Sequence, residues 1–210
     1  MKIAEVYSHL NGEEYLLVHK PALYTELRQI LTGLNANRHR TKVSKEARIL
    51  GKMLFAPKAI NAAYKRLFRR SHWDSEVYSY YVTTNRAFLD QVVNLPLAEQ
   101  ARFLKSKGIP SPIRSYKQTD FVKDEVAVEV QFGKYPFVAY DLFVKHLLFY
   151  SGGLINVGVE VLPMKAMTQP TDGPRTMSSG IAYFEGEVYN VMRHGRSNPP
   201  VPLVIIGLMP

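Results

Sequence analysis

Apolar and polar residues alternate most regularly in one segment, SYKQTDFVKDEVAVEVQFGKYPF, which spans residues 115–137. In its second half, one side of an extended chain is apolar and the other side is mixed. The first side carries Val126, Val128, Val130 and Phe132, and the second carries Ala127, Glu129 and Gln131. The segment therefore predicts two successive β-strands, the second of which docks its apolar side on a core.

Hydrophobic spacing elsewhere predicts helices first, and then strands and helices in alternation. Helices are predicted over residues 21–34, 57–71, 85–94, 97–107, 136–150 and 181–193, and strands over residues 2–7, 155–162 and 201–208. The helix over 136–150 is apolar nearly all the way round, which indicates burial on more than one side. This order is typical of an α/β fold with a mixed sheet flanked by helices. No repeat or clear boundary divides the chain, so we expect a single domain over residues 1–210.

The charge of the chain changes this picture by indicating a polyanionic partner. The net charge is +9 and the pI is near 9.6. Nucleic acid is the first candidate and an anionic membrane surface the second; the alternative is a protein that is basic without such a partner. The predicted helix over 57–71 carries five basic residues and no acid. The polar, basic segment 35–48 is either a solvated loop or an arm that contacts DNA.

Missing residues and motifs exclude several kinds of chemistry. Without cysteine, the chain has no disulfides, no thiolate chemistry and no cysteine-based zinc site. GxxxxGK[ST], GxGxxG, GxSxG and HExxH motifs are absent. The six histidines lack a metal-ligand spacing, and His146 is expected to be a core or interface residue. With no apolar signal segment at the N-terminus and no stretch long enough to cross a bilayer, we expect a cytoplasmic protein.

Two carboxylates remain as candidates for catalysis. If Asp120 lies on the strand beside Glu129, their carboxylates converge and repel, and a hard divalent cation such as Mg²⁺ holds both ionised. Gln131 follows on the same side of the strand. The spacing alone also fits a strand whose polar side is simply solvated. The basic composition favours a metal site that faces a phosphodiester.

The same hairpin resembles the active-site hairpin of the BglII/BstYI branch of type II restriction endonucleases, with the greater similarity to its BstYI members. That branch belongs to the PD-(D/E)xK nuclease superfamily and carries Gln where Lys is usual, as Gln131 does here. The resemblance covers nearly the whole chain. It runs through KIAEVYSHLNGEEY, RTKVSKE, YPFVAYDLFVKH, INVGVEVLPM, MSSGIAYFEGEVYNV and PLVIIGL.

The resemblance implies a restriction-endonuclease-like mixed sheet and a symmetric homodimer that cuts palindromic double-stranded DNA. It implies that Asp120 and Glu129, with the Val130 carbonyl, bind Mg²⁺, and that Gln131 is the third catalytic side chain. The implied recognition site has a GATC core, in the form R/GATCY, with 5′ overhangs of four bases. A cognate DNA methyltransferase is expected in a prokaryotic host. The alternative is a sequence-specific DNA-binding protein on a nuclease scaffold that does not cut, and the intact carboxylate pair argues against it.

Gln131 leaves part of the chemistry open, because an amide is neither a base nor a charge. It can orient the attacking water, so the metal or another lysine must supply the remaining stabilisation. Lys123 and Lys134 are neighbours in the sequence that could do so. Glu76 is a candidate for a further acidic residue at the site.

The resemblance also implies contacts with bases. Lys134 would face the outer base pair, where a lysine suits guanine; the alternative is a phosphate contact or a solvated side chain. Ser178 and Ser179 would also contact DNA, because hydroxyl groups both donate and accept. The alternative for the two serines is that they cap the helix over 181–193.

Overall fold

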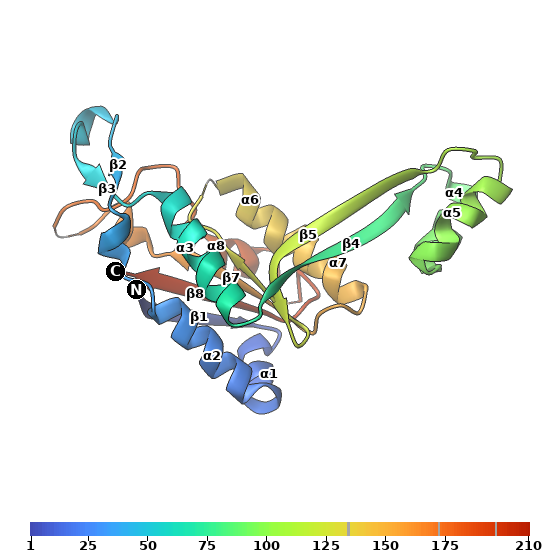
Figure 1. Cartoon of the computed structure of the whole chain (residues 1–210), viewed down its shortest axis with the longest axis horizontal. Coiled ribbons are helices and arrows are strands. Elements are labelled where there is room, and N and C mark those ends of the chain that lie inside the picture. The colour runs from blue at the N-terminus through green and yellow to red at the C-terminus, as the bar shows by residue number, and fades with distance from the viewer. Residues whose placement is uncertain (134, 172, 196) are drawn as a thin grey trace. The chain divides into compact units, whose positions relative to one another are not determined.

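The computed structural model describes residues 1–133, 135–171, 173–195 and 197–210 (Figure 1). These residues form two compact units, Met1–Ser75 with Thr119–Pro210 and Glu76–Gln118. Every proposed site residue except Glu76 belongs to the sequence range of the first unit. The expectation of one endonuclease domain over 1–210 stays a prediction.

The described helices and strands follow the predicted alternation. The helices are α1 (Gly12–His19), α2 (Pro21–Thr32), α3 (Pro57–Arg70), α4 (Arg86–Asn94), α5 (Leu97–Ser106), α6 (Tyr135–Tyr140), α7 (His146–Ser151) and α8 (Phe184–Arg193), with a π-helical segment, Asp141–Lys145, between α6 and α7. The strands are β1 (Lys2–His9), β2 (Lys42–Val43), β3 (Met53–Leu54), β4 (Asp74–Val82), β5 (Ile113–Lys123), β6 (Val126–Val130), β7 (Val157–Pro163) and β8 (Leu203–Met209).

The main sheet is mixed, as the sequence predicts. Its strand order is β1-β8-β7-β6-β5-β4. The strands β6, β7 and β8 are parallel, whereas β1 is antiparallel to β8 and β5 is antiparallel to β6. The short strands β2 and β3 form a separate antiparallel pair. The predicted fold class, a mixed sheet flanked by helices, is therefore confirmed.

Helices cover both faces of the sheet in the first unit. On the α2–α3 face, helices α1, α2 and α3 pack on the valines of β6 and β7. This core includes Leu16, Leu27, Tyr64, Val126, Val128, Val130, Val157 and Val159. On the α6–α8 face, the stretch from α6 through the π-helical segment packs on the sheet together with α8. This second core includes Val138, Leu142, Val191, Leu203 and Ile205.

A tight turn brings β5 and β6 together as the predicted hairpin. The register pairs Phe121 with Val128 and Lys123 with Val126. The turn residues Asp124 and Glu125 both have positive φ, of 46° and 64°. Positive φ at both central residues belongs to the type I′ turn, whose twist matches that of the flanking strands. The turn thus fixes which residues of β5 stand beside Glu129.

The second unit, Glu76–Gln118, has a small core of its own. Helices α4 and α5 meet through Phe88 and Phe103, whose ring centroids are 6.2 Å apart in an edge-on arrangement. The buried Gln100 side chain accepts a hydrogen bond from the Tyr81 backbone N–H at 2.9 Å and donates to the Leu95 carbonyl at 2.8 Å. These bonds tie the helices to the strand β4.

The structure adds elements that hydrophobic spacing does not reveal. Helix α1 is short, and only Gly12 and Leu16 of it are buried. Strand β4 alternates weakly and has no buried residue. Both lack the one-sided apolar pattern on which prediction depends. Among the residues that the structure describes, no helix is long and apolar enough to span a membrane.

Candidate active site

Glu129 lies in the middle of the sheet and is almost completely buried. It stands on β6, and its exposed fraction is 1%. Its side chain points to the α6–α8 face, opposite to the valines of the same strand. A strand with a solvated polar side is therefore the wrong interpretation here.

Three donors hold one oxygen of this carboxylate. The Thr119 hydroxyl donates to Glu129 Oε1 at 2.7 Å, and the Asp120 backbone N–H donates to the same atom at 3.2 Å. The Lys145 ammonium lies 2.9 Å from it. Because these three donors all contact Oε1, this oxygen is held toward β5 and the helix that carries Lys145.

The helical stretch over β6 contributes a cation and a third carboxylate. Lys145 and Asp141 mark the two ends of the π-helical segment, and the Lys145 Nζ to Asp141 Oδ1 distance is 2.6 Å. Asp141 is buried, and the Lys145 side chain is 14% exposed. Short π-helical segments inserted in α-helices occur frequently at functional sites.

Burial and neighbouring charges shift the protonation of this cluster. Burial raises the pKa of Glu129 to about 8, against the opposing charge of Lys145. The nearby carboxylates of Asp120 and Asp141 raise it further. Burial also raises the pKa of Asp141, again opposed by Lys145. For Lys145, burial lowers the pKa, but the negative charges of Glu129 and Asp141 have the larger combined effect. They hold the pKa of Lys145 above its usual range.

The other predicted catalytic residues surround this cluster. Asp120 is exposed at the end of the hairpin that carries Thr119, so its carboxylate is open to solvent beside the buried one. Gln131 is partly buried just beyond the end of β6, and its side chain lies close enough to Asp141 to lower the pKa of that carboxyl group. The Val130 backbone lies between Glu129 and Gln131 at the same end of the strand. The structure thus brings Asp120, Glu129 and Gln131 together at the carboxyl end of β6.

A second buried acidic group lies beside Glu129. Glu160 is its neighbour in the parallel register between β6 and β7 and is fully buried. Burial, followed by the charges of Asp141 and Glu129, raises the pKa of Glu160 well above its usual range. His146 Nε2 lies 3.5 Å from Glu160 Oε2, and burial lowers the pKa of His146 to about 3. His146 is therefore uncharged at neutral pH, and its contact with Glu160 is not an ion pair.

Lys145 and Asp141 are the site residues that sequence reasoning missed. In the sequence, Lys145 is only a charged residue that interrupts an apolar segment. The signal that could have found the pair is an Asp and a Lys four residues apart inside a helix that is otherwise apolar, because buried charges are normally paired. Lys123, a sequence neighbour of the hairpin, is not part of the cluster: its ammonium lies 2.8 Å from Glu26 Oε1 and 2.9 Å from the Ser71 carbonyl oxygen.

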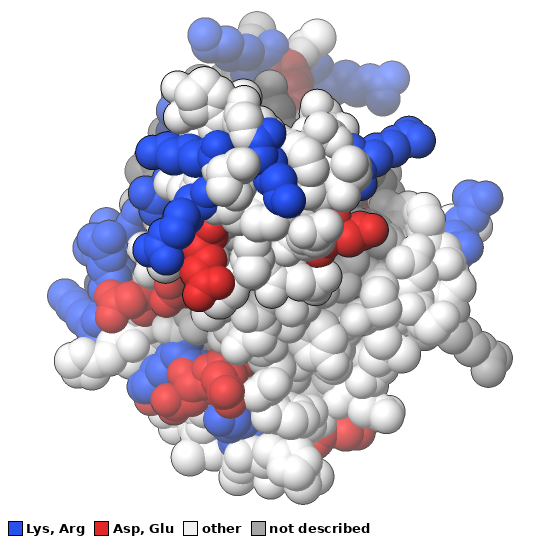
Figure 2. Space-filling model, turned by 90° about the vertical axis from the view of Figure 1, so that its right-hand side faces the viewer, with Lys and Arg blue, Asp and Glu red and all other residues white. Residues whose placement is uncertain are grey.

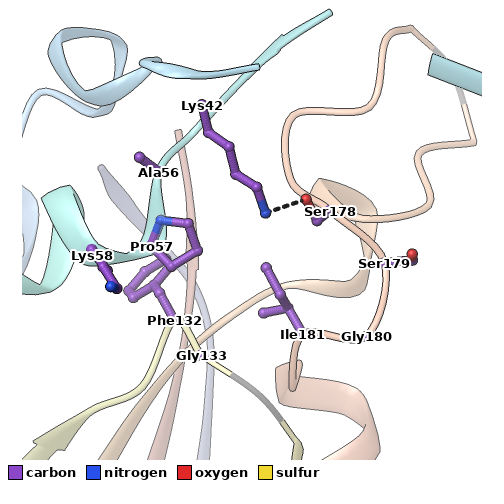
Figure 3. A pocket seen from close by; sticks show the side chains of 10 residues that line it. All are labelled: Lys42, Ala56, Pro57, Lys58, Phe132, Gly133, Ser178, Ser179, Gly180 and Ile181. Atoms are coloured by element: carbon purple, nitrogen blue, oxygen red, sulfur yellow. Dashed lines mark hydrogen bonds between the residues drawn. The ribbon is translucent and has the colours of Figure 1, made fainter. Parts of the chain in front are cut away.

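A pocket of about 680 Å³ gathers the predicted DNA-contacting serines (Figure 3). The Lys42 ammonium, from the basic segment 35–48, donates to Ser178 Oγ at 2.7 Å across the pocket. The Ser179 backbone N–H donates to Glu46 Oε1 at 2.9 Å. The wall opposite the serines includes Lys58 of α3, together with Phe132 and Gly133, which directly follow Gln131.

Two predictions about this region have different outcomes. The serines do not cap the following helix, because α8 begins at Phe184 and its N-cap residue is Tyr183. The alternative interpretation of Ser178 and Ser179 as caps is therefore wrong. Lys134 lies outside the described residues, and its proposed contact with DNA stays a prediction.

The net charge of +9 is carried by basic side chains on the surface, one face of which is shown in Figure 2. Lysine and arginine side chains project from the face shown in Figure 2, with smaller groups of acidic side chains between them. On α3, Arg66 and Arg70 line a second pocket together with Arg38 and His39. Glu76 belongs to the other compact unit, where its carboxylate accepts a hydrogen bond from the Val77 backbone N–H at 3.1 Å. Its proposed role in the site stays a prediction.

Solved structures with the same fold are restriction endonucleases. The crystal structure of restriction endonuclease BglII complexed with a DNA 16-mer matches with a TM-score of 0.66 and 20% identity, over 100% of this chain and 79% of that one. The crystal structure of free BglII matches with a TM-score of 0.56 and 19% identity, over 100% and 80% of the two chains. No curated protein matches the sequence. These matches show that the chain has the fold of the BglII structures.

The sequence identifies the family within that class. A profile of the family described as "Restriction endonuclease BglII/BglIII" matches residues 4–208, nearly the whole chain. The chain belongs to this family. It is a type II site-specific deoxyribonuclease, and enzymes of this kind generally use a divalent metal ion.

Proposed function

We propose that this enzyme hydrolyses phosphodiesters of double-stranded DNA at R/GATCY in a Mg²⁺-dependent reaction that leaves 5′ overhangs of four bases. Resemblance to the BstYI members of the PD-(D/E)xK superfamily supports the site and the overhang. The observation that carries the chemistry is the buried Glu129 carboxylate, which three donors hold beside the exposed Asp120.

The residues at the carboxyl end of β6 fit a magnesium ion. Mg²⁺ is usually bound through one or two carboxylates, with water and substrate phosphate completing the octahedron. Asp120 and Glu129 would supply the carboxylates, and the Val130 carbonyl would supply a third protein oxygen. No group of three or more His, Asp or Glu side chains arranged to hold a metal occurs in the described part of the chain, so substrate oxygens would have to complete the site. When bound, the cation would lower the pKa of water and polarise a phosphoryl oxygen.

Gln131 would act on the attacking water. Its side-chain amide has a donor and an acceptor but no charge, so it orients a water molecule without taking its proton. The amide lies near Asp141, whose pKa it lowers. Attack in line with the leaving oxygen would leave a 5′-phosphate and a 3′-hydroxyl.

We further propose that the enzyme works as a symmetric homodimer, in which each subunit cuts one strand of a palindrome. Exposed apolar residues on the helical stretch after β6 support an interface there. Phe137 is 59% exposed, Val144 43% and Tyr150 38%. A methyltransferase with the same specificity would protect the DNA of a prokaryotic host whose cytoplasm contains both proteins.

The pocket around Ser178 and Ser179 would meet the bases. Hydroxyl groups accept and donate, which suits a position that tolerates either purine or either pyrimidine. Lys42 and Lys58 would neutralise phosphates at the rim of this pocket, and Lys134 would face guanine at the outer base pair. The basic segment 35–48 would then be an arm that contacts DNA.

Sequencing of fragment ends tests this proposal. Unmethylated plasmid is digested with the native protein in Mg²⁺, and every end is mapped. We expect discrete ends at R/GATCY, each with a four-base 5′ overhang. Ends at another sequence would overturn the proposed site. Binding to GATC duplexes without cutting, in either Mg²⁺ or Mn²⁺, would instead favour the alternative of a DNA-binding protein on a nuclease scaffold.

A further inference from the structure

Among the described residues, the cation that forms ion pairs with Glu129 and Asp141 comes from a helix rather than from the hairpin. Lys145 Nζ lies 2.9 Å from Glu129 Oε1 and 2.6 Å from Asp141 Oδ1. The two carboxylates stand on different elements, β6 and the π-helical segment. A single ammonium group therefore bridges the strand that carries the catalytic candidates and the helix that covers it.

The surroundings of Lys145 call for a positive charge. The charges of Asp120 and Asp141 both act on Glu129, and Glu160 is the neighbour of Glu129 in the sheet. Gln131, the side chain at the end of the strand, is neutral. Removing one partner from a buried group of charges leaves the others uncompensated, which is strongly unfavourable. Lys145 thus compensates the charges of the two carboxylates that it contacts, Glu129 and Asp141.

The location of Lys145 suits action on Glu129 rather than on DNA. Its side chain is only 14% exposed, and its ammonium is engaged with both carboxylates. The three donors on Oε1 leave Glu129 Oε2 as the oxygen directed away from Lys145 and Thr119. An ammonium fixed from the helix therefore orients the carboxylate and leaves its other oxygen for a cation.

We propose that Lys145 is a positioning residue for DNA cleavage, which holds the Glu129 carboxylate in place and supplies the positive charge that Gln131 lacks. Asp141 in turn holds the Lys145 ammonium and the Gln131 amide. This inference rests on the proposed use of Glu129 in metal-dependent cleavage. It assigns the helix over β6 a part in the reaction, in addition to its part in the core.

Substitutions at Lys145 test the inference through binding and cutting measured separately. Lys145→Met removes the charge and keeps most of the length of the side chain, whereas Lys145→Arg keeps the charge. Lys123→Met is the matched control, because it breaks a partly buried ion pair, with Glu26, on a lysine of the hairpin outside the cluster. Affinity for a GATC duplex is measured in EDTA, the melting temperature is recorded, and single-turnover cutting is measured in Mg²⁺ below the melting transition.

We expect Lys145→Met to cut about a hundredfold more slowly, comparable to the loss of one preorganised donor in an active site. Its affinity for DNA should stay within about twofold of the native value, and Lys145→Arg should recover at least tenfold of the lost rate. Lys123→Met should lower the melting temperature without changing the rate of the folded enzyme. Equal cutting by native protein and Lys145→Met would overturn the inference while leaving the proposed function intact. A native protein that does not cut would instead contradict the proposed function.

A double substitution keeps the test decisive if Lys145→Met does not fold. Gln131→Lys with Lys145→Met returns a positive charge to the cluster from the strand, since the side chain at position 131 already reaches Asp141. We expect this variant to fold and to cut within about tenfold of the native rate. A folded double variant that binds DNA but does not cut would contradict the proposed role of Lys145.

Discussion

The two faces of the central sheet are built from the same strands but have opposite chemistry. On the α2–α3 face, β6 and β7 present valines that pack in a hydrophobic core with the helices. On the α6–α8 face, the same strands present Glu129 and Glu160 in adjacent register, both buried. Alternation along a strand makes this separation possible, because successive side chains point to opposite faces.

The α2–α3 face contributes to the stability of the fold, whereas the α6–α8 face carries the residues of the proposed active site. The α2–α3 face needs only shape and apolar surface, which many sequences provide. The α6–α8 face has to keep carboxylates in a dry environment, which is costly unless the charges are paired. Lys145 pairs with Glu129 and Asp141, whereas burial raises the pKa of Glu160 and so favours its neutral form. Natural proteins tolerate such costs mainly at functional sites.

The largest effect that separates the two faces is expected from Glu129→Ala. Without this carboxylate, cutting in Mg²⁺ should fall by about a thousandfold or more, because metal binding and the geometry of the site are lost together. Affinity for a GATC duplex should remain. A single-turnover assay beside a binding titration measures both quantities, and a variant that cuts within tenfold of native would contradict this account.

Val128→Ala, one residue earlier on the same strand, should have the opposite effect. Val128 is fully buried on the α2–α3 face. Its truncation removes two methyl groups and leaves a small cavity, so the free energy of unfolding should fall by about 2 kcal/mol. Urea unfolding measures this loss. The cutting rate of the folded variant should be native, and a large loss of rate would show that the two faces are not separable.

The smallest effect is expected from Glu160→Gln, as a change in the pH dependence of stability. Because the folded-state pKa of Glu160 is raised above the unfolded value of about 4.5, its contribution to stability is full below pH 4.5 and declines as the pH rises toward the folded pKa. Glutamine does not titrate. Between pH 4 and pH 8, the free energy of unfolding of the variant should therefore rise relative to that of the native protein. The expected rise is about 1 kcal/mol or more, the equivalent of one pKa unit.

Urea unfolding in EDTA at several pH values measures that gain. The matched control is Glu5→Gln on β1, which makes the same substitution at an exposed position. If the difference between Glu160→Gln and the native protein is constant with pH, then the buried carboxyl group does not influence stability as we describe.

The hairpin and most of the fold could be predicted because they follow from strong local patterns. Alternation from Val126 to Phe132 predicted the buried side of β6 correctly, and helical spacing located α2 and α3 within two residues at each end. Helix α1 was missed because its apolar residues do not share a face: Leu17 is 55% exposed and Val18 70%. A pattern without a single apolar side gives no basis for prediction.

The candidate site could be predicted only in part, because one half of it comes from another element. Asp120, Glu129 and Gln131 lie in one hairpin, so their proximity follows from the turn. Lys145 and Asp141 lie near Glu129 because the helix after β6 packs on the α6–α8 face. The spacing of residues in the sequence does not predict that tertiary contact. The π-helical segment that carries both residues has no signature in the apolar pattern of the helix.

Asp120→Asn offers the most direct test of the central claim. That claim is that Asp120 and Glu129, at the carboxyl end of β6, form the site at which DNA is cut. Asp120 is exposed, so its substitution removes a proposed metal ligand without disturbing the buried core. The measurement is single-turnover cutting of a preformed complex with a GATC duplex after addition of Mg²⁺. We predict native affinity and native melting temperature with cutting reduced by at least about a thousandfold. Native-like cutting by this variant would contradict the account.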